Sequence, residues 1–192
     1  LGLLGQLTVQ LLKASGCRVL GADLDRSKLQ LAQQSGADMV AASSDLADAA
    51  ATFSDGHGVD AVIITASTKD NGPIEVAGEI ARKKGRVVVV GAVGMNVPRE
   101  SYYQKELDLR LSMSYGPGRY DTAYEEHGHD YPFGYVRWTE QRNMQAFLEL
   151  VAAGKVQLKP LITHRFPIEQ AESAYALMME GSTPYIAMVI TY

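Results

Sequence analysis

Two glycines near the start of the sequence have a spacing suited to holding a phosphate. Gly2 and Gly5 stand directly before a segment whose apolar residues recur at helical spacing. Such glycines let a backbone approach a pyrophosphate, and the free N–H groups of the following helix favour its negative charge. The run matches the last four positions of a G-x-G-x-x-G turn: Gly2, Leu3, Leu4 and Gly5. Because helices often begin near glycine, these two residues alone leave the interpretation open.

An aspartate further along the chain strengthens the interpretation of residues 2–5 as a phosphate-binding turn. Residues 17–22 predict a short strand, and Asp23 closes that strand. A dinucleotide-binding fold places a carboxylate at about this distance from the glycines, where it accepts hydrogen bonds from both ribose hydroxyls. The same carboxylate repels the extra phosphate of NADP, so NAD is favoured. The alternative, that Asp23 caps a helix, is weaker because Asp25 suits that role better.

The elements that must position these residues alternate along the chain. Continuous β-branched runs at 59–65 and 87–91 are typical of a parallel sheet that is covered by helices. We therefore predict an α/β fold: a Rossmann-like, doubly wound, mostly parallel sheet with helices on both faces. The expected helices are residues 4–14, 26–35, 45–54, 73–84, 140–153 and 167–180. The expected strands are residues 17–22, 38–42, 59–65, 87–91, 107–115, 161–166 and 185–192.

Several local features of the helices are also predicted. Ser44 and Thr139 are expected to cap helices, and Lys83-Lys84 suit the carbonyl end of the helix at 73–84. The first helix is expected to set apolar residues against polar ones. The apolar set is Leu4, Leu7, Leu11 and Leu12, and the polar set is Gln6, Gln10 and Lys13.

Other residues of a ligand cleft should follow the neighbouring strands, because ligands of such sheets lie beyond the carboxyl ends of the strands. The expected lining residues are Thr65, Ala66, Gly91, Ala92 and Val93. Gly91 and Gly94 can equally be ordinary turn glycines, and the sequence leaves that choice open.

Residues 107–115 alternate between apolar and polar types, which predicts a strand at the edge of the sheet. An exposed edge favours pairing with a second subunit. Residues 119–138 are rich in Tyr, Gly, His and Pro and have no clear period, so we interpret them as an ordered insertion. Its aromatic residues could stack on a sugar or cover a nicotinamide, but we favour a small core of their own. We expect residues 1–118 and 139–192 to form the dinucleotide-binding domain.

Several segments together resemble the cofactor domain of zinc-type medium-chain alcohol dehydrogenases. The segments are residues 1–5, 18–23, 36–38, 58–62, 85–91 and 160–167, with Lys28, Ala171, Ala174 and Tyr175. The resemblance implies that Asp23 binds the adenosine ribose with help from Lys28. It implies that the backbone near Thr65, 91–93 and Tyr115 borders the nicotinamide. It also implies a homodimer through the edge strand at 107–115.

A narrower resemblance is to bacterial two-part oxidoreductases, in which an alcohol-dehydrogenase-like half precedes a glucose–fructose-oxidoreductase-like half. Residues 115–121 and 130–140 carry it. The resemblance to alcohol dehydrogenases implies hydride transfer between an alcohol or sugar hydroxyl and NAD. The first strand, the catalytic residues and any zinc are expected to lie upstream, so this chain alone is expected to be inactive.

Three alternatives stay open. The first is a zinc-free, NADPH-dependent enzyme resembling quinone reductases, which Asp23 disfavours. The second is a non-catalytic, NAD-responsive or scaffolding module. The third is a chain that binds no dinucleotide and persists only as a dimer.

Composition limits the classes of partner. The 192 residues carry a net charge of −4, which argues against nucleic acid and anionic membranes. Cys17 stands alone, and the pair His127 and His129 lacks the further ligands that a zinc site needs, so we expect no metal in this chain. No long apolar run or signal peptide is visible, and we expect a cytoplasmic protein.

Overall fold

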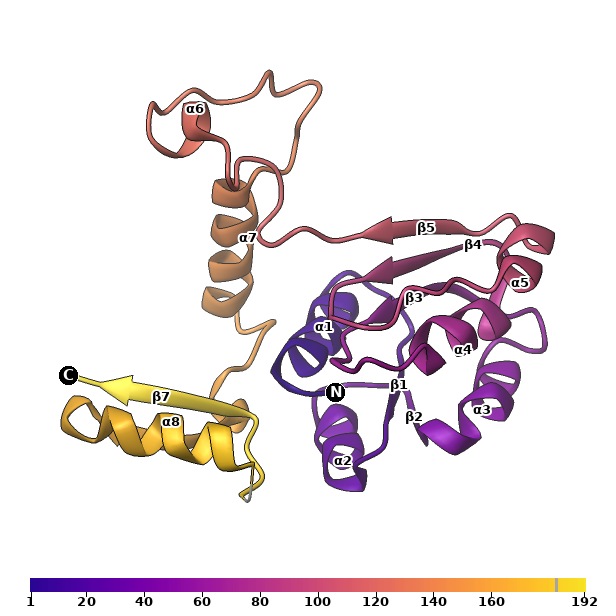
Figure 1. Ribbon diagram of the computed structural model, residues 1–192, viewed down its shortest axis with the longest axis horizontal. Helices are drawn as coiled ribbons and strands as arrows, with labels where there is room; N and C mark the ends of the chain where they lie inside the picture. The colour runs from indigo at the N-terminus through magenta and orange to yellow at the C-terminus, as the bar shows by residue number, and fades with distance from the viewer. Residues whose placement is uncertain (182) are drawn as a thin grey trace.

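The computed structural model describes residues 1–181 and 183–192, in which helices and strands alternate along the chain (Figure 1). The helices are α1 (Leu3–Ala14), α2 (Arg26–Gln34), α3 (Leu46–Phe53), α4 (Gly72–Ile80), α5 (Arg99–Gln104), α6 (Thr122–Glu125), α7 (Glu140–Ala152) and α8 (Ala171–Glu180). The strands are β1 (Leu20–Asp23), β2 (Met39–Ala42), β3 (Val59–Ile64), β4 (Ala81–Val89), β5 (Asp108–Leu111), β6 (Ile162–Pro167) and β7 (Ala187–Thr191).

The strand pairings of these elements are parallel, which confirms the predicted fold class. β1 pairs with β2, β4 lies between β3 and β5, and β6 pairs with β7. Val87, a residue of the β-branched run, is fully buried in the middle of the three-stranded sheet. Such a run suits a strand whose two faces are both covered.

Instead of the one continuous sheet expected from the sequence, the described residues form three separately hydrogen-bonded sheets. The turn before α1 lies between two of them. A Cβ atom added at Gly5 would lie 3.0 Å from Thr65 Oγ1, directly after β3. One added at Gly21, in β1, would lie 3.3 Å from the Leu1 side chain. Residues 1–5 therefore contact both sheets.

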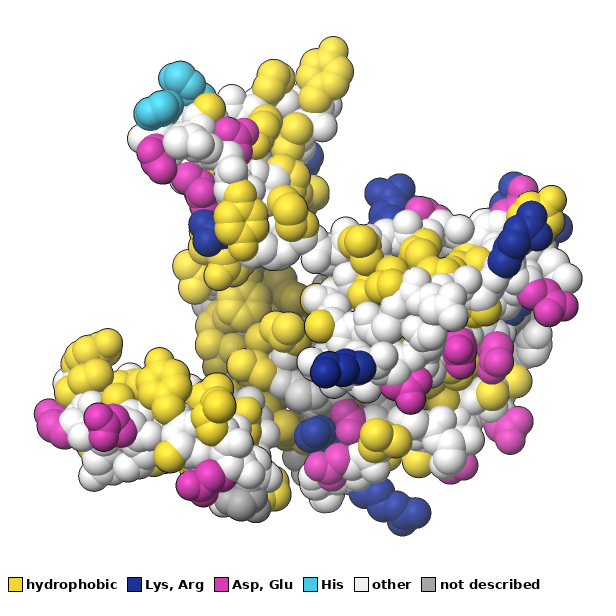
Figure 2. Space-filling model, viewed as in Figure 1, with side chains coloured by type: hydrophobic (Ala, Val, Ile, Leu, Met, Phe, Trp, Pro, Cys, Tyr) yellow, Lys and Arg dark blue, Asp and Glu magenta, His cyan; other side chains and the backbone are white. Residues whose placement is uncertain are grey.

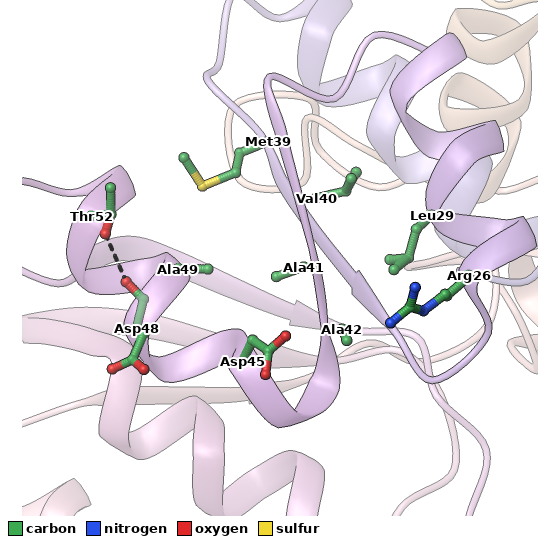
Figure 3. Close-up of a pocket in the computed structure, with 10 residues that line it drawn as sticks. All are labelled: Arg26, Leu29, Met39, Val40, Ala41, Ala42, Asp45, Asp48, Ala49 and Thr52. Carbon is green, nitrogen blue, oxygen red and sulfur yellow. Dashed lines mark hydrogen bonds between the residues drawn. The ribbon is translucent and has the colours of Figure 1, made fainter.

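Two apolar clusters hold the helices on these sheets. One joins β3 and β4 to α4 and α5 and includes Ile64, Ile74, Ala77, Ala81, Val87, Val89 and Tyr102. The other joins α1 and α2 to the chain around β1 and includes Val9, Val19, Ala32 and Ala37. The positions of α2 and α3 on the two sides of β2 are visible in Figure 3.

The predicted apolar face of α1 is wrong. The buried residues of this helix are Gly5, Gln6, Val9 and Gln10, whereas Leu4 is 54% exposed. Gln10 is buried because its carboxamide bonds both ways with a backbone: its Nε2 donates to Gln157 O at 3.2 Å, and its Oε1 accepts from Gln157 N at 2.6 Å. Burial of a polar side chain is tolerated when its hydrogen bonds are satisfied.

The predicted helix at residues 73–84 is also too long. α4 ends at Ile80, and Lys83 and Lys84 belong to β4 rather than to the carbonyl end of the helix. Lys105 occupies that position instead. Its Nζ donates to the carbonyl oxygens of Gly78, Glu79 and Ala81 at 2.6–2.9 Å. A cation at this end satisfies free carbonyls and opposes the helix dipole.

Asp25 caps α2 as predicted, by accepting a hydrogen bond from Ser27 N at 2.9 Å. The prediction for Ser44 is wrong, because a 3₁₀ turn at Ser43–Asp45 precedes α3 and Asp45 is the N-cap residue. Thr139 lies at the N-cap of α7, but its hydroxyl accepts from the Tyr124 hydroxyl at 2.9 Å instead of capping the helix. β5 covers 108–111, fewer residues than the predicted 107–115.

The carboxyl-terminal part, with α7, α8, β6 and β7, extends away from the other two sheets (Figure 1). None of the residues of α7 is buried, and apolar side chains line its surface and that of α8 (Figure 2). Met144, Leu148, Tyr175 and Met178 are 46–64% exposed. No helix among residues 1–181 and 183–192 is long and apolar enough to cross a membrane.

Replacing Lys105 tests how the end of α4 is stabilised. We expect Lys105→Met to lower the free energy of unfolding by about 1–2 kcal/mol, because three helix-end carbonyl groups lose a charged donor. Urea unfolding followed by circular dichroism measures the change. Lys83→Met, at an exposed position in β4, is the matched control and should change stability by less than about 0.5 kcal/mol. Equal effects of the two substitutions would contradict the capping role.

Candidate cofactor-binding site

The start of α1 has free hydrogen-bond donors. Gly2 is the N-cap residue, no described side chain caps the helix, and its first turn contains no acidic residue. Leu3 and Leu4 are 37% and 54% exposed. The first N–H groups of a helix lack partners within the helix, and with the dipole they favour an anion. The local structure can therefore hold a negatively charged group.

The two glycines of this turn differ in what they contact. A Cβ atom at Gly5 would crowd Thr65 and Leu1, so packing within the chain explains a glycine there. A Cβ atom at Gly2 would meet nothing within 4 Å, and its backbone angles are ordinary extended ones, φ −66° and ψ −163°. The contacts of the described chain therefore do not require a glycine at position 2.

Asp23 lies at the carboxyl end of β1, against this turn. Its Oδ2 accepts a hydrogen bond from the amino group of Leu1, and its Oδ1 accepts one from Asp25 N at 2.9 Å. Burial raises the pKa of Asp23, but the hydrogen bonds from Leu1 N and Asp25 N, with the charge of Lys28, outweigh burial and lower the pKa below its usual value. The carboxylate is therefore ionised at neutral pH beside the open end of α1.

Lys28 lies near Asp23 on α2. Its Nζ is 4.0 Å from Asp25 Oδ2, and its side chain is one-third exposed. The ammonium group can therefore shift between Asp25 and a ligand at modest cost, since such exposed ion pairs are weak.

The chain after β3 and the chain after β4 lie together. Ser67 and Ala92 form a parallel bridge, and Thr68 N donates to Ala92 O at 2.8 Å. A Cβ atom at Gly91 would lie 2.0 Å from Ala66 O, so a glycine is required at position 91.

Gly94 is explained in the same way. A Cβ atom there would lie 2.3 Å from Asn71 Oδ1, and Gly94 N donates to Asp70 O at 3.0 Å. Close packing within the chain therefore explains both glycines, and contact of either one with a cofactor stays a prediction. Thr65 is half-buried, and Ala66 and Ala92 are exposed beside this packed region.

The side chains of two predicted residues point elsewhere. Val93 packs against the core of the three-stranded sheet. The backbone oxygen of Tyr115 accepts from Asn143 Nδ2 at 2.8 Å, and the Arg119 guanidinium lies 5.6 Å from its ring. The structure thus brings Gly5 close to Thr65, and Asp23 close to Leu1, but it links Tyr115 to α7 and to the segment 119–138.

Only part of segment 119–138 forms the small core that we favoured. Tyr124 stacks on Tyr131 with ring centroids 5.5 Å apart, and its hydroxyl donates to Thr139. The other aromatic residues are exposed: Tyr120 by 70%, Phe133 by 59%, Tyr135 by 92% and Trp138 by 51%. In the described part of the chain no three candidate ligand side chains are grouped for a metal ion, so His127 and His129 do not contribute to such a group.

A shallow groove of about 500 Å³ lies elsewhere, along the free edge of β2 between α2 and α3 (Figure 3). Arg26, Met39 and Asp48 are among its lining residues. None of the predicted site residues lines this groove, but two of its lining residues adjoin Asp23: Ala42 is the strand partner of Asp23, and Arg26 begins α2.

Sequence reasoning missed Gln6. This side chain is fully buried, and its Nε2 donates to Leu1 O at 3.0 Å and to Lys28 O at 2.9 Å. Gln6 follows Gly5 and lies three residues before Val9, so the three residues share one face of the helix. That spacing was the available signal that Gln6 is buried.

Comparison with known proteins identifies the family. Residues 4–127 match the family model described as zinc-binding dehydrogenase. The chain belongs to the zinc-binding dehydrogenase family. It is 25% identical to D-arabitol-phosphate dehydrogenase of Enterococcus avium over 188 residues, which cover 94% of the chain and 46% of the relative.

Two solved structures have the same fold. Alcohol dehydrogenase from Thermus sp. ATN1 superposes with a TM-score of 0.75 and is 18% identical in sequence. The match covers 100% of the present chain and 49% of the Thermus chain. An alcohol dehydrogenase from E. coli CFT073, solved with NADH, superposes with a TM-score of 0.72 and is 20% identical in sequence. That match covers 100% of the present chain and 50% of the E. coli chain. The chain thus spans about half the length of the proteins that it matches.

The environment of Asp23 predicts how stability depends on pH. A pKa that is lower in the folded state contributes stability above the unfolded value, here near 3.8, and this contribution is lost as pH falls through the folded pKa. We expect Asp23→Asn to be less stable than the wild type at pH 7, and the difference to shrink towards pH 3. Urea midpoints across this range measure it. A difference that is constant with pH would contradict the expectation.

Proposed function

We propose that this chain is the NAD(H)-binding domain of an oxidoreductase that transfers hydride between an alcohol or sugar hydroxyl and a nicotinamide cofactor. The observation that carries the proposal is the ionised Asp23 beside the uncapped start of α1. Membership of the zinc-binding dehydrogenase family supports it. So do the names of the relatives, which include a sugar-alcohol-phosphate dehydrogenase and alcohol dehydrogenases.

Each part of the site has a separate binding role in this proposal. The backbone at Gly2, Leu3, Leu4 and Gly5 holds the pyrophosphate, because amide donors and the helix dipole favour an anion there. Asp23 accepts hydrogen bonds from the adenosine ribose, and Lys28 assists. Thr65, Ala66, Gly91 and Ala92 border the nicotinamide side, to which Val93 and Tyr115 contribute backbone. The absence of a side chain at Gly2 leaves room for a ligand close to the backbone.

NAD is preferred over NADP in this proposal. A carboxylate that accepts hydrogen bonds from both ribose hydroxyls binds NADP much less favourably than NAD. In NADP a phosphate replaces one hydroxyl, so two negative charges face each other. Lys28 contributes a side-chain cation close to Asp23, and its charge lowers the pKa of that carboxyl. A zinc-free, NADPH-dependent enzyme is therefore the less favoured alternative.

The bound cofactor supplies the hydride chemistry, and this domain supplies placement. We propose that residues 1–118 and 139–192 form the binding domain, with 119–138 as an insertion, and that proton-handling groups and any zinc belong to residues outside this chain. The two-part architecture with a glucose–fructose-oxidoreductase-like half stays a prediction, as does a cytoplasmic location.

Cofactor preference tests the role of Asp23. We expect Asp23→Asn in the full-length protein to weaken NAD binding about 10- to 100-fold and to narrow the preference over NADP, because a charged acceptor is lost. Isothermal titration with NAD and NADP measures both affinities. Asp25→Asn is the matched control, since asparagine also caps helices well and should leave the preference unchanged.

Two results would contradict the proposal. The first is a wild-type protein that binds neither cofactor, which would favour a scaffolding role. The second is an Asp23→Asn variant with unchanged affinities. NAD binding without turnover of any alcohol or sugar would instead favour an NAD-responsive module.

We also propose a homodimer through residues 107–115. In the described chain β5 is hydrogen-bonded only on its β4 side, and Leu111 and Met113 are 69% and 59% exposed. A lysine on an edge strand opposes strand pairing between subunits. We expect Leu111→Lys to weaken dimerisation at least about tenfold, as measured by sedimentation equilibrium. The control is Leu148→Lys on α7, which is similarly exposed at 64% and should leave the dimer intact. A monomeric wild type would contradict the proposal.

A further inference from the structure

Gln6 connects the two segments that surround Asp23. The side chain is fully buried at the start of α1. Its Nε2 donates to the backbone oxygen of Leu1 at 3.0 Å and to that of Lys28 at 2.9 Å. Both N–H groups of the carboxamide are therefore used to join the turn before α1 to α2.

These contacts link the carboxylate, through α2, to the start of α1. Asp23 Oδ1 accepts from Asp25 N at 2.9 Å, and Asp25 caps α2, which contains Lys28. Gln6 then joins Lys28 O to Leu1 O in the turn before α1. Movement of Asp23 away from the start of α1 therefore strains the bonds of Asp25 and Gln6.

The oxygen atom of the Gln6 carboxamide shows that burying this side chain lowers the stability of the fold. Gln6 Oε1 is buried and has no hydrogen-bond partner among the described residues. An unpaired buried acceptor destabilises a fold, and an apolar side chain of similar size would avoid this penalty. Filling of space therefore does not explain glutamine at this position, whereas donation to two backbone oxygens does.

We infer that Gln6 is a positioning residue: it fixes the distance between the Asp23 carboxylate and the amide groups of α1, and so sets the affinity for NAD and the preference for NAD over NADP. This inference rests on the proposed function. Two groups that grip one ligand bind it best when their separation is fixed before binding, because ordering them on binding lowers affinity.

The test compares two buried glutamines of the same helix. Gln6→Met keeps the length and approximate volume of the side chain but removes both hydrogen bonds. Gln10→Met removes an equivalent pair of bonds, which joins α1 to the backbone of Gln157 instead of to the surroundings of Asp23. Both variants are prepared in the full-length protein and titrated with NAD, NADP and AMP at a temperature at which circular dichroism shows them folded.

We expect Gln6→Met to weaken binding of NAD and AMP about tenfold, equivalent to about 1.4 kcal/mol, and to reduce the ratio of NAD to NADP affinity about threefold or more. Gln10→Met should keep that ratio and bind NAD within about twofold of the wild type. If Gln6→Met does not fold, Gln6→Asn is used in its place, since it keeps a carboxamide that is one methylene shorter. The same losses are expected for it.

Separate outcomes overturn the inference and the proposed function. A wild type that binds NAD, with Gln6 variants of unchanged affinity and preference, overturns only the inference. Equal losses in the Gln6 and Gln10 variants also overturn it, because general destabilisation of α1 would then account for the effect. A wild type that binds none of the three nucleotides overturns the proposed function and the inference with it.

Discussion

The close approach of residues 1–5 to two sheets is the constraint on which the site depends. No ladder joins β1 to β3 among the described residues, and the turn before α1 contacts both. Gly5 and Gly21 permit this approach, because a side chain at either position would crowd Thr65 or Leu1. Because Gly5 lies against Thr65 and Leu1 against Asp23, the carboxyl ends of β3 and β1 meet the free amide groups of α1 in one region.

The chemistry available in that region is binding rather than proton transfer. The groups that meet there are backbone donors, the Asp23 carboxylate, the Lys28 ammonium group and the hydroxyl of Thr65. Nothing in this set forms a pair of acid and base groups with opposed pKa shifts, which enzymes use to move protons. A site of this kind suits a domain that orients a dinucleotide while the cofactor supplies the redox step.

The sequence predicted features that depend on local chemistry. The β-branched runs predicted β3 and β4, and the Asp25 cap was correct. The predictions failed where a residue distant in the sequence determines where a helix ends or which side chain is buried. The run at 82–86 looked like a basic helix end, but Lys105 supplies the cation at the carbonyl end of α4, so the run is free to enter β4. Gln6 and Gln10 were expected on the polar face because they are polar. The sequence does not show that backbone oxygen atoms distant along the chain accept hydrogen bonds from their side chains.

These glutamines also explain how α1 is oriented. Val9 is the one apolar side chain among the buried residues of this helix, so apolar burial alone does not fix its direction. Gln6, Gln10 and Lys13 instead tie it to α2, to Gln157 and to Asp38. Hydrogen bonds are directional, whereas apolar contacts are not, and bonds at successive turns resist rotation as well as sliding. In the proposed site the start of α1 faces the pyrophosphate, so a fixed helix direction favours binding, and the leucines of α1 are then free to remain partly exposed.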